Sequence, residues 1–130
     1  MNIQNKIGRI LAAHPRLGVG ILFGSVSRGG TRADSDIDVA VAGARPLDSG
    51  EKLALVEEIA VETGRPVDLI DLQASGGLIL QQVLTKGKLV YCPDRNLYAE
   101  LIKRMLFEQA DFMPYHRRLL RERRRAWIGS

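Results

Sequence analysis

Two short apolar runs flank the most polar stretch of this chain, and this arrangement constrains the fold more than any other feature. Leu17–Phe23 (LGVGILF) and Ile37–Val41 (IDVAV) are rich in apolar and β-branched residues, so each predicts a buried strand. Between them, Ser25–Ser35 is polar and glycine-rich, and we expect it to contain one short helix. Gly24 closes the first run, and Asp36 and Asp38 stand at the head of the second.

The remaining chain predicts alternating helices and strands. Periodic apolar residues and turn signals predict helices over Asn2–Ala13, Ser49–Glu62 and Gly77–Thr85, and strands over Pro66–Leu72 and Lys88–Tyr91. Gly64 is placed to end the second helix in a left-handed conformation. The order predicts an α/β (α+β) fold: a small mixed sheet of about four strands with helices packed on one face.

Length and composition indicate one globular domain. The 130 residues suit a single core, which we place in residues 1–93. Residues 94–130 predict a C-terminal helical arm that Pro114 interrupts, and this arm either belongs to the same domain or binds a partner. No apolar run is long enough to cross a membrane, and the lone Cys92 excludes an intrachain disulfide, so we expect a cytoplasmic protein.

Positive charge is concentrated near the C-terminus. The net charge is +4, and six arginines crowd into Arg117–Arg125. Such a run can bind nucleic acid or an acidic protein surface, although a solvated helix end explains it equally well. We therefore do not favour a nucleic-acid partner.

The aspartates that lead into the second strand are candidate metal ligands. Asp36 and Asp38 are two residues apart, so in a strand both project from one face, about 6.5 to 7 Å apart at their roots. Paired hard oxygen ligands at this spacing suit one or two Mg²⁺ ions. An Asp-x-Asp sequence is often only a turn or cap, but here it continues directly into Val39–Val41.

A third acid should come from the strand at Pro66–Leu72. Asp68 and Asp71 have opposite parity in that strand, so only one of them can face the Asp36–Asp38 pair. We prefer Asp68, which lies closer to the strand start, and expect Asp71 to serve the opposite face or the strand end.

The turn after the first strand is a candidate phosphate site. Gly24 permits close backbone approach, the Ser25 hydroxyl can bond a phosphate oxygen, and amides at a following helix N-terminus favour anions. Arg28 and Arg32 can pair with phosphate, with Arg28 nearer the turn.

Taken together, these residues carry a family resemblance. Gly24-Ser25, ten intervening residues and Asp36-Ile37-Asp38 match the Gly-Ser/Asp-x-Asp signature of the polymerase-β-like nucleotidyltransferase superfamily. The stretch GSVSRGGTRADSDIDVAV more closely resembles the minimal nucleotidyltransferases that serve as antitoxins of HEPN-domain toxins. The resemblance continues through PVDLIDL and QQVLTKGKLVYC, and therefore covers roughly residues 17 to 92.

The resemblance implies roles for individual residues. Asp36, Asp38 and Asp68 would be the catalytic metal ligands, while Gly24, Ser25 and Arg28 would hold the nucleotide. The implied reaction is transfer of a nucleoside monophosphate, AMP from ATP, to a hydroxyl of a cognate HEPN toxin. Two alternatives stay open: an antitoxin that neutralises its partner by contact alone, or nucleotidyl transfer to a small molecule or an RNA 3′ end. We expect the chain to form a hetero-oligomer with its partner or a homodimer.

Overall fold

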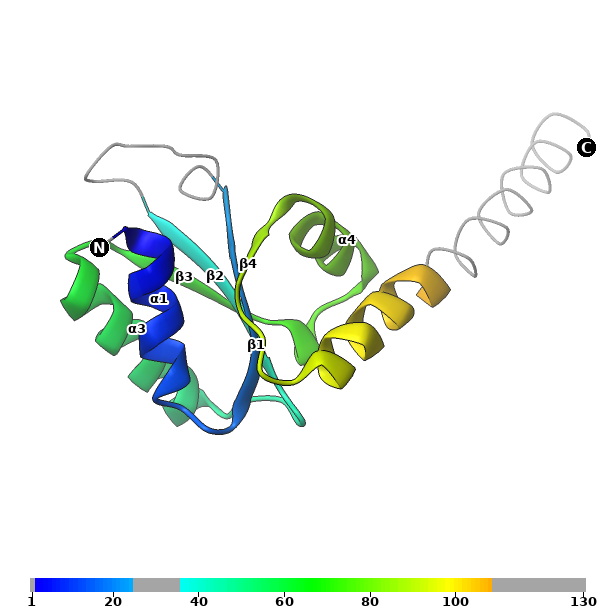
Figure 1. Cartoon of the computed structure of the whole chain (residues 1–130), viewed down its shortest axis with the longest axis horizontal. Coiled ribbons are helices and arrows are strands. Elements are labelled where there is room, and N and C mark those ends of the chain that lie inside the picture. The colour runs from blue at the N-terminus through cyan, green and yellow to red at the C-terminus, as the bar shows by residue number, and fades with distance from the viewer. Residues whose placement is uncertain (1, 25–35, 109–130) are drawn as a thin grey trace, which may run out of the picture.

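A computed structural model of the chain describes residues 2–24 and 36–108 (Figure 1). In chain order, its elements are α1 (Ile3–Ala12), β1 (Leu17–Phe23), β2 (Ile37–Gly43), α3 (Ser49–Thr63), β3 (Val67–Asp71), the short 3₁₀ helix η1 (Leu72–Ala74), α4 (Gly77–Lys86) and β4 (Lys88–Tyr91). A further helix begins at residue 95 and is described to residue 108; we call it helix 95–108. The short helix expected within Ser25–Ser35 and the arm beyond residue 108 lie outside the described residues.

The four strands form one mixed sheet in the order β3-β2-β1-β4. β1 runs antiparallel to both β2 and β4, whereas β2 and β3 are parallel. A parallel pair needs a crossover between its strands, and α3 provides it. Within the described sheet β3 is therefore an edge strand, with β2 as its one neighbour.

Helices cover both faces of this sheet. Figure 1 shows α1 and α3 together on one side, and α4 with helix 95–108 on the other. On the first side, Ile7 and Leu11 of α1 and Ile59 of α3 are fully buried in one core cluster. On the second side, the buried residues from helices are Leu80, Val83, Leu101 and Met105, and they pack with Val19, Ile21, Ala40 and Ala42 of the strands.

The predicted fold class is confirmed, with one difference in the layers. The sequence predicted helices on one face, whereas α4 and helix 95–108 also cover the second. The reason is that β1 and β2 carry apolar side chains on both faces, and the face with Ala40 and Ala42 must also be shielded from water. Leu101 and Met105, which the sequence assigned to the arm, therefore belong to the core.

Local signals place the helix ends where the sequence predicted them. Asp48 and Glu51 form a reciprocal capping box at the start of α3. Gly64 ends α3 with φ 67°, the left-handed conformation expected of it. No helix within residues 2–24 and 36–108 combines the length and apolarity needed to cross a membrane.

Candidate active site

Three strands bring Gly24, Asp38 and Asp68, three of the predicted site residues, to one end of the sheet. The register pairs Phe23, the last residue of β1, with Asp38 of β2, and pairs Asp38 in turn with Asp68 of β3. Directly paired residues point to the same face of a sheet, so the carboxylates of Asp38 and Asp68 share one face. The site therefore runs from the Gly24 turn across Asp38 to Asp68 at the edge.

Gly24 leaves no room for a side chain beside Asp38. Its φ is 75°, in the left-handed region that glycine adopts without strain. A Cβ built at this position would fall on the Asp38 carboxylate, with Oδ2 as the nearest atom. The turn after β1 and the acid of β2 are therefore in direct contact, which explains why a glycine stands here.

The acids differ in exposure and act on one another electrostatically. Asp36 and Asp68 are exposed, while Asp38 is half-buried. Burial raises the pKa of the Asp38 carboxyl above its usual value, and repulsion from Asp68 and then Asp36 raises it further. Asp38 thus lies where a neighbouring positive charge relieves an existing electrostatic cost.

The three acids fit a hard divalent cation by their chemistry. Asp38 and Asp68 offer carboxylate oxygens from the adjacent strands β2 and β3, and Asp36 offers its own from the position just before β2. Carboxylate oxygen is the ligand type that Mg²⁺ prefers. Among the residues that the structure describes, no three His, Cys, Asp or Glu side chains are arranged to hold a metal ion as they stand. Asp38 is nevertheless repelled by Asp68 and by Asp36, and a bound cation would offset this repulsion.

Asp71 occupies the opposite face and has a structural environment. It is buried, with 5% of its surface exposed, and pairs in register with Val41 on the side of α1 and α3. Its carboxylate accepts hydrogen bonds from the backbone N–H of Leu47 at 2.7 Å and of Gln73 at 2.9 Å. Of the two acids in this strand, Asp68 therefore lies beside Asp38, whereas Asp71 is buried and bonds backbone N–H groups that stabilise the fold.

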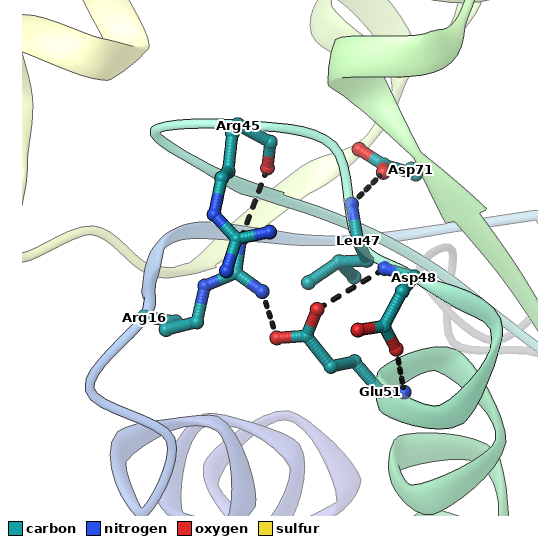
Figure 2. A network of polar contacts seen from close by, with 6 residues as sticks. All are labelled: Arg16, Arg45, Leu47, Asp48, Glu51 and Asp71. Carbon is teal, nitrogen blue, oxygen red and sulfur yellow. Dashed lines mark hydrogen bonds and ion pairs between the residues drawn. The ribbon is translucent and has the colours of Figure 1, made fainter.

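Figure 2 shows Asp71 at the edge of a larger polar network. Leu47, whose N–H bonds Asp71, directly precedes the capping box of α3. Arg16 forms an ion pair with Glu51 of that box and donates to the Arg45 carbonyl oxygen. This network fastens the β2–α3 connection at the end of the sheet away from the candidate site.

Two of the predicted nucleotide-binding residues, Ser25 and Arg28, lie outside the described residues, as does Arg32. The sequence reasoning did not identify Gln73 and Arg104, which organise the segment that follows β3. Arg104 donates to the carbonyl oxygens of Leu72 and Ser75 and to Oε1 of Gln73. Bonds of this kind leave no periodic signal in the sequence, so pattern analysis could not find them.

Comparison with solved structures finds the same fold in toxin–antitoxin complexes. A chain of a toxin–antitoxin structure with AMP-PNP matches with a TM-score of 0.71 and 31% identity, covering 97% of this chain and 95% of the other. A chain from a structure of a tri-AMPylated HEPN toxin of Shewanella oneidensis with its MNT antitoxin matches with a TM-score of 0.61 and 30% identity, covering 98% and 93%.

Comparisons of the sequence point to the same group of proteins as the comparisons of the structure. The protein adenylyltransferase MntA of Shewanella oneidensis is 40% identical over 86 residues, which span 65% of this chain and 62% of that relative. The match therefore leaves more than a third of the relative's length unaligned. The family model of polymerase β nucleotidyltransferases matches residues 5–96, which include β1, β2, β3 and the acids on them. The chain therefore belongs to the polymerase β nucleotidyltransferase family.

Proposed function

We propose that this chain is a Mg²⁺-dependent nucleotidyltransferase that transfers AMP from ATP to a hydroxyl side chain of a HEPN toxin, and that it acts as the cytoplasmic antitoxin of that pair. The observation that carries the proposal is the alignment of the Gly24 turn, Asp38 and Asp68 on one face of the sheet. Family membership supports the reaction type, and the names of the similar proteins support the acceptor.

Each end of this alignment has a task in the reaction. The Gly24 turn, with Ser25 and Arg28, binds the triphosphate, because a bare glycine lets phosphate oxygens approach the backbone. Asp36, Asp38 and Asp68 would hold Mg²⁺, which would supply charge neutralisation and a lowered pKa for the attacking hydroxyl. Asp68 lies on the edge strand and is exposed, so an acceptor hydroxyl can reach it.

The proposed transfer is a single displacement at the α-phosphorus of ATP. A bond forms between the acceptor oxygen and the α-phosphorus of ATP, the bond from that phosphorus to the β-phosphate bridging oxygen breaks, and pyrophosphate leaves. The hydroxyl proton passes to the exposed Asp68 carboxylate. Asp38, between the Gly24 turn and Asp68, would be a ligand of the cation.

The test is label transfer with matched variants. Wild-type chain, Mg²⁺, α-labelled ATP and the cognate HEPN protein should give a labelled HEPN band, and Asp38→Asn should abolish it. Glu57→Gln, the same charge change at an exposed position of α3, should leave the label unchanged. A wild-type chain that binds the HEPN protein but transfers no label contradicts the proposal.

Neutralisation by contact alone is the second candidate, because the similar solved structures are complexes between toxin and antitoxin. It predicts that the double variant Asp36→Ala and Asp38→Ala still neutralises the toxin. We place the partner contacts in the arm, residues 94–130, and particularly beyond residue 108. Truncation after Glu108 keeps the core residues Leu101 and Met105 and so tests this contact without removing part of the fold.

A further inference from the structure

Helix 95–108 is bonded to the segment that ends the strand of the third acid. Arg104 Nη2 donates to the Leu72 carbonyl oxygen at 2.5 Å and to that of Ser75 at 3.4 Å, and Nη1 donates to Oε1 of Gln73 at 3.2 Å. The Leu72 carbonyl oxygen already accepts the Ser75 N–H at 3.4 Å, so Arg104 adds a second donor to it and one to the carbonyl oxygen just after η1. Arg104 therefore fastens η1 to a helix about thirty residues further along the chain.

The same segment is fastened to the body of the sheet. Gln73 Nε2 donates to the carbonyl oxygen of Gly43, the last residue of β2, at 2.8 Å. Asp71 accepts from the N–H groups of Leu47 and Gln73, and its own carbonyl oxygen accepts from the Ser75 hydroxyl at 2.8 Å. The end of β3 is thus held by β2, by the β2–α3 connection and by helix 95–108.

This attachment matters for Asp68 because β3 is short and lies at the edge. Among the described strands its five residues pair with β2 alone, and at its start the Ile37 N–H donates to the Pro66 carbonyl oxygen at 2.8 Å. A slip of one residue in a strand turns every side chain to the other face. After such a slip Asp68 would no longer lie opposite Asp38. A neighbouring residue of β3 would take its place in the register.

We propose that Arg104 is a positioning residue for the reaction: by holding η1 it fixes the end of β3, and with it the orientation of Asp68 toward Asp38. This inference depends on the proposed nucleotidyl transfer. It makes helix 95–108 part of the catalytic apparatus, through its bonds to η1. A misplacement of reacting groups by about 1 Å can cost on the order of 100-fold in rate, so a loosened β3 should be visible in kcat.

The experiment compares Arg104→Gln with Arg104→Lys and with Lys86→Gln in the full chain. Lys86 is the exposed last residue of α4, outside both the candidate site and the arm, so Lys86→Gln removes the same charge elsewhere. We expect Arg104→Gln to lower kcat about 10-fold or more, with KM for ATP within about twofold of wild type. Arg104→Lys, which keeps a donor for the Leu72 carbonyl, should recover part of kcat, and Lys86→Gln should match wild type.

Hydrogen exchange supplies a readout that does not depend on activity. Amides of residues 67–75 should exchange faster in Arg104→Gln, while those of β1 and α1 should not. Unchanged kcat in a folded Arg104→Gln variant, or exchange that accelerates equally throughout the chain, would overturn the proposal. If Arg104→Gln does not fold, Gln73→Leu, which removes the links to Arg104 and Gly43, is held to the same expectations. If the wild-type chain itself transfers no label, the proposed function is refuted instead. The hydrogen-exchange rates of residues 67–75 then still show whether Arg104 holds the end of β3.

Discussion

Asp38 and Asp68 stand directly opposite each other on the parallel pair β2–β3, on the same face, with Asp68 exposed at the edge of the sheet. Their neighbourhood is electrostatically unfavourable for Asp38, whose pKa rises through burial and through the charges of Asp68 and Asp36. Because the two carboxylates repel each other, binding a cation between them is electrostatically favourable.

Asp68→Asn should abolish transfer with little effect on the fold. Asp68 is exposed, so its replacement should change the free energy of unfolding by less than about 0.5 kcal/mol. Loss of the proton acceptor and metal ligand should lower kcat by about 100-fold or more. Urea unfolding and single-turnover label transfer on the same preparation measure the two effects. Normal kcat would show that Asp68 is no part of the machinery.

Asp71→Asn should have the opposite profile. The asparagine keeps one acceptor but turns an N–H₂ group toward one of the backbone donors that the carboxylate now binds. We expect a loss of about 2–3 kcal/mol in the free energy of unfolding. In the fraction that remains folded at low temperature, label transfer should persist at a reduced rate, because the Asp68 carboxylate is still present although the end of β3 is held less firmly. A stability equal to that of wild type would contradict the structural role of Asp71.

Asp38→Asn should raise the thermal midpoint in buffer without divalent cations. Because the pKa of Asp38 is raised in the folded state, its ionised form disfavours folding at pH above that folded pKa. The cost fades as pH falls through the folded pKa, and it is absent below the usual value of 3.8, where the carboxyl is protonated in both states. The gain in midpoint should therefore be present at pH 7 and vanish below about pH 4.

Adding Mg²⁺ provides the control for this prediction. The ion should raise the midpoint of wild type and have a smaller effect on Asp38→Asn, because binding to the folded state stabilises it. An Asp38→Asn variant that is less stable than wild type at pH 7, without Mg²⁺, would contradict the electrostatic account.

Gly24→Ala and Gly64→Ala form a matched pair that separates backbone strain from a steric clash. Both glycines have φ near 70°, so an alanine at either position costs about 1–2 kcal/mol. At Gly64 a Cβ meets nothing within 4 Å, whereas at Gly24 it meets the Asp38 carboxylate. Calorimetric titration with ATP and Mg²⁺ should therefore show weakened binding for Gly24→Ala alone. Equal affinity in both variants would show that the Gly24–Asp38 contact has no role in binding.

Much of the site was predictable because it depends on residues that are close together in the sequence and on the alternation of side chains in a strand. Strand alternation separates Asp68 from Asp71, and the spacing from the Gly24 turn to Asp38 is readable in the sequence; the register then places these residues together. The cover on the second face of the sheet was not predictable. Leu101 and Met105 have the spacing of any amphipathic helix, and the pattern does not reveal whether that helix packs on its own sheet or on a partner.

The connection through Arg104 was unpredictable for a different reason. Its acceptors are backbone carbonyl oxygens and one amide, which any sequence supplies, and its partners are about thirty residues away. A contact of this kind depends on tertiary geometry and leaves no trace in composition or periodicity.

The opposite orientation of Asp68 and Asp71 offers a way to sort related chains by their sequences. A relative that has abandoned catalysis but still folds has no reason to keep an acid at the position of Asp68, while the backbone donors at Leu47 and Gln73 continue to require one at the position of Asp71. Relatives with both acids should be transferases, and relatives with only the second should neutralise their toxins by contact.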